Sequence, residues 1–215
     1  MLPMVIKPML AAAAPGPFDS DDYLFEIKWD GIRCLAFVSD RTLRLQSREL
    51  LDITAQFPEL DRLRQLPEET VLDGELIALE NGRPSLSKIQ GRVQLQGRNR
   101  IELLSQRSGV VFMVFDLLYL RGQSVTAEPL TKRRQLLREI LGELNWPMVR
   151  MTEGVVGKGC DLFDRVKQLG LEGVMAKWLE GKYWTGKRSS AWKKIKQAGL
   201  RPNRFVAPTP LSEEP

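Results

Sequence analysis

The chain of 215 residues contains no histidine and only two cysteines. Without histidine, Ser-His and Cys-His catalysis and most zinc sites are excluded, because each of these needs an imidazole. Cys34 and Cys160 lie far apart and form no ligand pattern, so we expect reduced thiols in a cytoplasmic protein. No apolar run approaches the roughly 18 to 20 residues that span a membrane. The sequence therefore predicts no membrane segment.

The length suits one sizeable domain, or a domain with a small appendage. The N-terminal stretch is apolar and rich in alanine, but no basic segment precedes its apolar part. This pattern does not favour a secretory signal peptide. We expect one domain over residues 1–200, followed by a Pro-rich, flexible tail over residues 201–215.

Positive charge is concentrated near the C-terminus. The net charge is +5 and the pI is near 9.3, which favours polyanionic partners. Between Lys177 and Arg204 there are nine Lys/Arg residues and one acid, with four interleaved aromatic residues. This segment is either a solvated surface with a few anchored aromatics or a phosphate-binding face, and its composition alone leaves both open.

Periodicity and turn residues predict an α+β fold with antiparallel sheets and helices packed outside them. Strands are expected at 23–31, 32–40, 41–50, 70–83, 109–120, 172–179 and 189–197. Helical spacing is found at 55–66, 131–144 and 159–170. Thr131 is a candidate N-cap for the second helix, and Asn81-Gly82 suits a type I′ hairpin turn.

Lys28 lies inside the apolar, strand-like run 25–37, where burying an ammonium group is costly. A lysine in a strand can snorkel outward with no functional role. Here, however, alternation places Glu26, Lys28 and Asp30 on one face. Burial lowers the pKa of such a lysine, while the acids either raise it or recruit a metal cation that lowers it again. Gly31 would allow a phosphate close to the backbone, so the pattern suits a nucleophile.

The stretch E-x-K-x-D-G-x-R, residues 26–33, resembles the first motif of the covalent nucleotidyltransferases. This family comprises ATP-dependent DNA ligases, RNA ligases and mRNA capping enzymes. Further family motifs follow in order, with Arg48 in LQSREL, Glu75 in LDGELIAL, Phe115 in VFDLLYL, Glu172 and Lys177 in LEGVMAKW, and Lys194 and Lys196 in WKKIK. Taken alone, each residue has an ordinary explanation as core or solvated surface. Their joint occurrence in family order favours the functional interpretation.

Two flanking phrases, IKPMLA and RPSLSKIQGR, are similar to those of bacterial and archaeal ATP-dependent DNA ligases, most of all the ligase domain of the bacterial end-joining ligase. The resemblance implies an ATP-grasp-like covalent nucleotidyltransferase fold with the nucleotide cleft between the sheets. It implies ATP and Mg²⁺ (or Mn²⁺) as cofactors. Lys28 would attack the ATP α-phosphate to give lysyl-AMP, AMP would pass to a DNA 5′-phosphate at a nick, and the 3′-hydroxyl would seal the strand.

The resemblance also assigns roles to residues. Phe115 would stack on adenine, and Glu26 would accept a hydrogen bond from the adenine amino group. The implied catalytic residues are Lys28, Arg33, Lys194 and Lys196. The implied ATP-binding residues are Glu26, Ile27, Lys28, Arg33, Arg48, Glu75, Phe115, Lys177, Lys194 and Lys196. Glu75 and Glu172 would hold the metal, and Arg48, Lys182, Lys187 and Arg188 would contact the nucleic acid.

Family ligases continue into an OB-fold domain of roughly 70 to 100 residues. Only 19 residues follow Lys196 here, so we expect no OB-fold domain. The chain is then either an excised catalytic fragment or a stand-alone adenylation protein. The expected partners are nicked duplex DNA and end-joining or other repair proteins. We also expect a monomer that is cytoplasmic and nucleoid-associated. Two alternatives stay open: an RNA ligase or capping-type nucleotidyltransferase, and a non-sealing nucleic-acid-binding module that kept the fold. An NAD-dependent ligase is disfavoured, because the stretch before Lys28 is too short for a nicotinamide-binding module.

Overall fold

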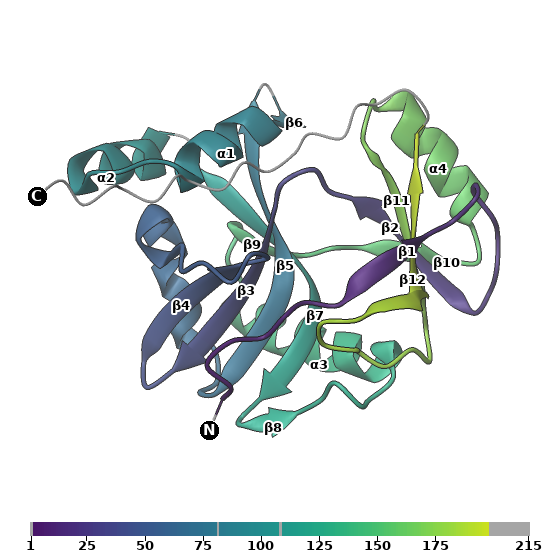
Figure 1. The fold of residues 1–215 in the computed structure, drawn as a ribbon, viewed down its shortest axis with the longest axis horizontal. Coiled ribbons are helices and arrows are strands. Elements are labelled where there is room, and N and C mark those ends of the chain that lie inside the picture. The colour runs from purple at the N-terminus through teal and green to yellow at the C-terminus, as the bar shows by residue number, and fades with distance from the viewer. Residues whose placement is uncertain (1, 81, 108, 198–215) are drawn as a thin grey trace, which may run out of the picture.

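The computed structural model describes residues 2–80, 82–107 and 109–197, which form two β-sheets with helices packed around them (Figure 1). The first sheet has the strand order β1-β12-β11-β2-β10. Its strands are β1 (Leu10–Ala13), β2 (Tyr23–Lys28), β10 (Gly154–Val156), β11 (Gly173–Trp178) and β12 (Arg188–Lys196). The α+β fold class predicted from the sequence is confirmed.

The second sheet has the order β4-β3-β5-β7-β8, with β6 beside β5 and β9 beside β7. Its strands are β3 (Ile32–Ser39), β4 (Thr42–Ser47), β5 (Thr70–Glu80), β6 (Arg83–Pro84), β7 (Val110–Leu120), β8 (Gln123–Ser124) and β9 (Val149–Met151). Pairing is antiparallel except for β1 with β12 and β7 with β9, which are parallel. The sheets are therefore antiparallel in their centres, as expected, with parallel additions.

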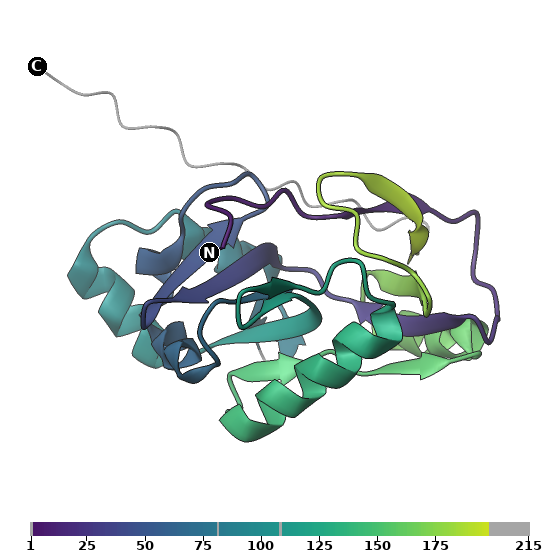
Figure 2. The same ribbon diagram turned by 90° about the horizontal axis from the view of Figure 1, so that it is seen from below.

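Helices cover the outer faces of both sheets. They are η1 (Thr54–Gln56) and η2 (Pro58–Gln65), both of the 3₁₀ type, and the α-helices α1 (Leu86–Val93), α2 (Arg98–Arg107), α3 (Leu130–Leu144) and α4 (Gly159–Gln168). The apolar face of α3, including Leu137 and Ile140, joins the main core of the second sheet, and Val166 of α4 packs on the first sheet. Figure 2 shows α3 along the outside of the molecule, near where the two sheets meet. No helix in the described ranges is long and apolar enough to cross a membrane.

Several sequence-based expectations need correction. Thr131 is not the N-cap of α3, because the helix begins one residue earlier, at Leu130, with Pro129 as its cap. The backbone N–H of Thr131 instead donates to the carbonyl of Leu179, at 3.1 Å. Helices α1 and α2 and strands β1, β8, β9 and β10 were not predicted. The β5–β6 hairpin is confirmed, but Asn81 and the predicted tail lie outside the described residues.

The chain passes from the first sheet to the second through Trp29, Asp30 and Gly31. The predicted strand 23–31 and its continuation 32–40 are thus β2 and β3, in different sheets. A Cβ atom at Gly31 would lie 2.2 Å from the carbonyl oxygen of Leu76, so a side chain has no room where the linker crosses β5. This close crossing sets Lys28, the last residue of β2, at the junction of the two sheets.

Candidate active site between the two sheets

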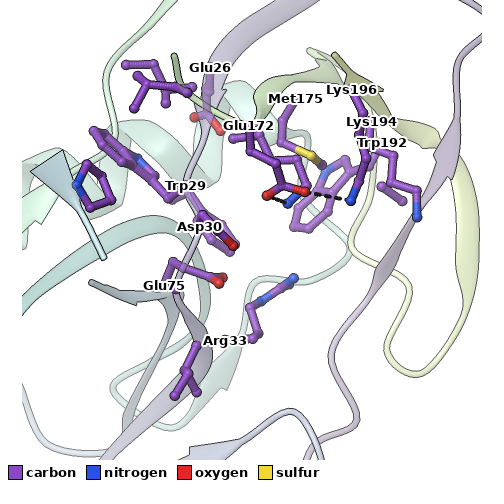
Figure 3. Close-up of a pocket in the computed structure, with 18 of the residues that line it drawn as sticks. Glu26, Trp29, Asp30, Arg33, Glu75, Glu172, Met175, Trp192, Lys194 and Lys196 are labelled. Atoms are coloured by element: carbon purple, nitrogen blue, oxygen red, sulfur yellow. Dashed lines mark hydrogen bonds and ion pairs between the residues drawn. The ribbon is translucent and has the colours of Figure 1, made fainter. Parts of the chain in front are cut away.

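A cleft of about 750 Å³ lies between the sheets, with β2, β11 and β12 on one side and β3, β5 and β7 on the other (Figure 3). The residues that were predicted to bind nucleotide or metal all line it: Glu26, Ile27, Lys28, Arg33, Arg48, Glu75, Phe115, Glu172, Lys177, Lys194 and Lys196. Arg188 lines the cleft as well, whereas Lys182 and Lys187 do not. Residues spread over most of the chain are thus brought to one place.

Lys28 forms an ion pair with Glu172, which directly precedes β11. The second carboxylate oxygen of Glu172 lies 2.6 Å from the ammonium nitrogen of Lys196 (Figure 3). Burial acts to raise the pKa of Glu172, but the attraction of Lys28 and Lys196 is larger in sum and lowers it. Glu172 is therefore an anion at neutral pH that holds Lys28 in the cleft rather than in bulk solvent.

Glu75 on β5 and Asp30 in the linker bring further negative charge to the cleft, and Figure 3 shows their carboxylates pointing into the same space. Burial, opposed by the attraction of Lys28 and Arg33, raises the pKa of Glu75 to about 7. Burial and repulsion from Glu172 likewise raise the pKa of Asp30. The raised pKa values mean that the neighbouring cations do not fully offset the effect of burial on these two carboxylates.

This imbalance fits a divalent cation, which prefers carboxylate oxygens and keeps part of its water shell. Glu75 and Glu172, the two predicted ligands, both face the cleft. Within the described ranges, no set of three or more His, Cys, Asp or Glu side chains is arranged around one metal position. The remaining ligands would therefore be water or a bound phosphate.

Arg33 is fixed in the cleft by a bidentate ion pair with Asp73, at 2.5 and 2.6 Å. Asp73 is fully buried, and it also accepts a hydrogen bond of 2.6 Å from the hydroxyl of Tyr183. The guanidinium carbon lies 4.7 Å from the ring centroid of Phe115 and 5.5 Å from that of Trp192. Its orientation is thus set by a buried network before any ligand arrives.

Glu26 is buried, and cations hold both of its carboxylate oxygens. Arg134 of α3 donates to one oxygen, and the ammonium group of Lys177 lies 2.6 Å from the other. Burial lowers the pKa of Lys177 despite the attraction of Glu26. The same ammonium group lies 4.0 Å from the ring centroid of Phe115. A carboxylate has about four acceptor positions, so Glu26 has room for a further hydrogen bond beside those from Arg134 and Lys177. Its contact with an adenine amino group stays a prediction.

Positive charge dominates the end of the cleft next to β12. Lys194 and Lys196 alternate along the strand and share one face. Burial, together with repulsion from Arg188, Lys196 and Lys28, lowers the pKa of Lys194. On the opposite side, Arg48 follows Ser47, whose hydroxyl accepts backbone N–H groups of the turn at 3.2 and 3.3 Å. This arrangement suits the binding of phosphate groups.

Some residues of the site were not identified from the sequence. Asp73 was visible inside the LDGE motif, but Arg134 resembled any basic residue of an amphipathic helix. The aromatics interleaved with the C-terminal basic residues divide into two groups. Tyr183 and Trp192 are core residues, with 3% and 2% exposure, whereas Trp178 and Trp184 are exposed. The basic segment is therefore partly a wall of the cleft and partly a surface.

Comparison with known proteins agrees with this geometry. The family model described as "ATP dependent DNA ligase domain" matches residues 8–196. The chain is 36% identical over 195 residues to the SPbeta prophage-derived DNA ligase-like protein LigB of Bacillus subtilis, covering 89% of this chain and 67% of that protein. It is 34% identical to the multifunctional non-homologous end joining DNA repair protein LigD of Mycobacterium tuberculosis, covering 89% and 24% of the two chains.

A solved structure of mycobacterial DNA ligase D complexed with ATP and MES superimposes with a TM-score of 0.72 at 33% identity, covering 89% of this chain and 60% of that one. The predicted similarity to the ligase domain of the bacterial end-joining ligase is thus confirmed, and so is the nucleotidyltransferase fold. The chain spans between about a quarter and two thirds of the length of these proteins.

Proposed function

Because this chain belongs to the ATP-dependent DNA ligase domain family, we propose that it is the catalytic domain of an ATP-dependent DNA ligase, with Lys28 as the nucleophile. The observation that carries this proposal is the position of Lys28 in the cleft, paired with Glu172 and close to a cluster of cations. A snorkelling surface lysine would have no reason to face such a cluster.

In the first step, Lys28 loses a proton and its Nζ attacks the α-phosphorus of ATP. A P–N bond forms, the bond to the bridging oxygen breaks, and pyrophosphate leaves. Phosphoryl-type transfer mainly requires positioning and charge neutralisation. Lys194 and Lys196 would neutralise the α-phosphate oxygens. Phe115 would stack on adenine, and Glu26 would accept a hydrogen bond from the adenine amino group, which favours ATP over GTP.

Glu75 and Glu172 would hold Mg²⁺ or Mn²⁺, and the bound ion would supply further neutralisation of phosphate charge. The raised pKa of Glu75 supports this assignment, because a nearby cation would restore the charged form of its carboxylate. With such an ion bound, Glu172 would exchange part of its pairing with Lys28 for a contact with the ion.

In the later steps, AMP passes to the 5′-phosphate at a nick, and the 3′-hydroxyl displaces it to seal the strand. Arg48, Lys182, Lys187 and Arg188 would contact DNA phosphates, so that binding weakens with salt. The names of the relatives favour DNA over RNA as substrate and end joining or another repair process as context. A monomer in the cytoplasm, associated with the nucleoid, completes the proposal.

Sealing of a nicked duplex tests this function. Wild-type protein with ATP and Mg²⁺ should seal a nick, and Lys28→Ala should not. On a nick that already carries a 5′-adenylate, Lys28→Ala should seal, because the lysyl-AMP step is bypassed. Equal ATP-dependent sealing by both proteins would contradict the proposal. A nick with RNA strands, run in parallel, tests the RNA ligase alternative, which preferential sealing of RNA would support.

A further inference from the structure

The loop between β11 and β12 carries an exposed tryptophan outside the cleft. Trp184 is 47% exposed, although the adjacent Tyr183 is only 3% exposed. Leaving a large aromatic surface in water forgoes the favourable free energy of its burial. Single exposed apolar residues are common, so the surroundings of Trp184 decide whether its exposure has a use.

The backbone of this loop is held in place on both sides of Trp184. Tyr183 donates its N–H to the carbonyl of Thr126 at 2.9 Å, and Gly186 donates to the carbonyl of Lys7 at 2.7 Å. The N–H of Trp184 itself lies 3.2 Å from the sulfur of Met9. Figure 2 shows the loop at the start of β12, beside the N-terminal segment. The fold thus presents the indole on an anchored loop.

One lysine contacts Trp184, and a second lies close to it in the chain. The ammonium group of Lys187 lies 5.5 Å from the indole ring, and Lys182 is exposed two residues before it. Neither lysine forms an ion pair with an acid in the part of the chain that the structure describes. The next residue, Arg188, pairs with Leu10, and both line the cleft. Lys187, whose ammonium group contacts the indole, therefore directly precedes a residue of the cleft wall.

We propose that Trp184, Lys182 and Lys187 form an accessory site for an unpaired nucleotide of the DNA substrate. The indole would stack on the base, and the two ammonium groups would contact the flanking phosphates. Aromatic residues beside cations are the usual means of binding single strands. An unpaired base is the fitting ligand because paired bases inside a duplex already stack on one another. The proposal rests on the proposed function, since it takes DNA as the substrate.

The test measures binding of a nicked duplex, with and without a short single-stranded flap at the nick, by fluorescence anisotropy. Wild-type protein should bind the flapped duplex more tightly. Trp184→Ala should lose about five-fold or more of this affinity, in line with the known stacking contribution of one base, and Trp184→Phe should keep most of it. Trp178→Ala is the matched control. Trp178 is 43% exposed, but it alternates with cleft-lining Lys177 and so faces the other side of the sheet.

Salt dependence separates stacking from charge. Lys187→Ala should reduce the slope of log affinity against log salt by about one, and Trp184→Ala should leave the slope unchanged. Equal binding of the flapped duplex by Trp184→Ala and wild type would overturn the proposal. So would a loss of affinity in Trp178→Ala as large as that in Trp184→Ala. A third contradicting result is a Trp184→Ala loss that is as large on the flap-free duplex as on the flapped one. Lysyl-AMP formation by Trp184→Ala and Trp178→Ala reports on the proposed function separately, and we expect it to be unchanged.

Discussion

Replacement of Glu75 by glutamine should stabilise the folded protein at neutral and alkaline pH. The carboxyl group of Glu75 is partly buried between the sheets, and burial raises its pKa from 4.5 to about 7. The folded state therefore keeps a proton that the unfolded chain has already released. Glutamine has nearly the same shape and does not titrate, so it removes this cost without opening a cavity.

The sign and size follow from proton linkage. Below about pH 4.5 the group is protonated in both states and costs nothing. Between about 4.5 and 7 only the unfolded state ionises, so the free energy of unfolding of the wild type falls as pH rises, and it levels off above about 7. The difference between the two pKa values corresponds to about 3 kcal/mol at about 1.4 kcal/mol per pH unit. This is an upper bound, because Glu75 retains some contact with water in the open cleft.

Urea unfolding of wild type and Glu75→Gln in EDTA, over about pH 4.5 to 8.5, measures this difference. The stability advantage of Glu75→Gln should grow with pH through the stated window. Mg²⁺ should reduce this advantage above pH 7, because the cation favours the charged carboxylate of the wild type. An advantage that is the same at about pH 5 and about pH 8 would refute the reasoning.

Two further predictions concern the walls of the cleft. Arg134→Met should cost about 3 to 5 kcal/mol in the free energy of unfolding, because it leaves the carboxylate of Glu26 buried with one partner fewer. The control, Arg98→Met, breaks an exposed pair with Glu102 and should leave the urea midpoint unchanged. Equal midpoints for the two variants would contradict this account. Phe115→Leu should raise the dissociation constant for ATP about two- to ten-fold by removing the stacking surface, as measured by calorimetry, and unchanged ATP affinity would count against the predicted stack.

The strands that form the centres of both sheets could be predicted from the sequence, because their apolar runs are long and end at clear turn residues. Strand β1 could not. Its sequence, Leu-Ala-Ala-Ala, has little intrinsic preference for a strand, and it exists because it pairs with β12, which lies near the other end of the chain. Helices α1 and α2 have equally weak local signals, so only tertiary packing defines them.

The same distinction holds for the site. The residues in the family motifs carry enough signal for the sequence alone to predict that they lie together. The residues that orient them do not, because each acts through a partner more than 100 positions away: Arg134 on Glu26 and Tyr183 on Asp73. An arginine in a helix and a tyrosine in a basic loop have ordinary local roles, and only the fold brings them to the cleft.

The central claim is that the amine of Lys28 becomes covalently bonded to AMP. Incubation with α-labelled ATP and Mg²⁺, denaturing electrophoresis and peptide mapping by mass spectrometry test it directly. The label should map to Lys28, be absent in Lys28→Ala, and persist in Lys193→Ala, a matched control on β12 whose lysine does not line the cleft. Label on another residue, or label that survives in Lys28→Ala, would contradict the account.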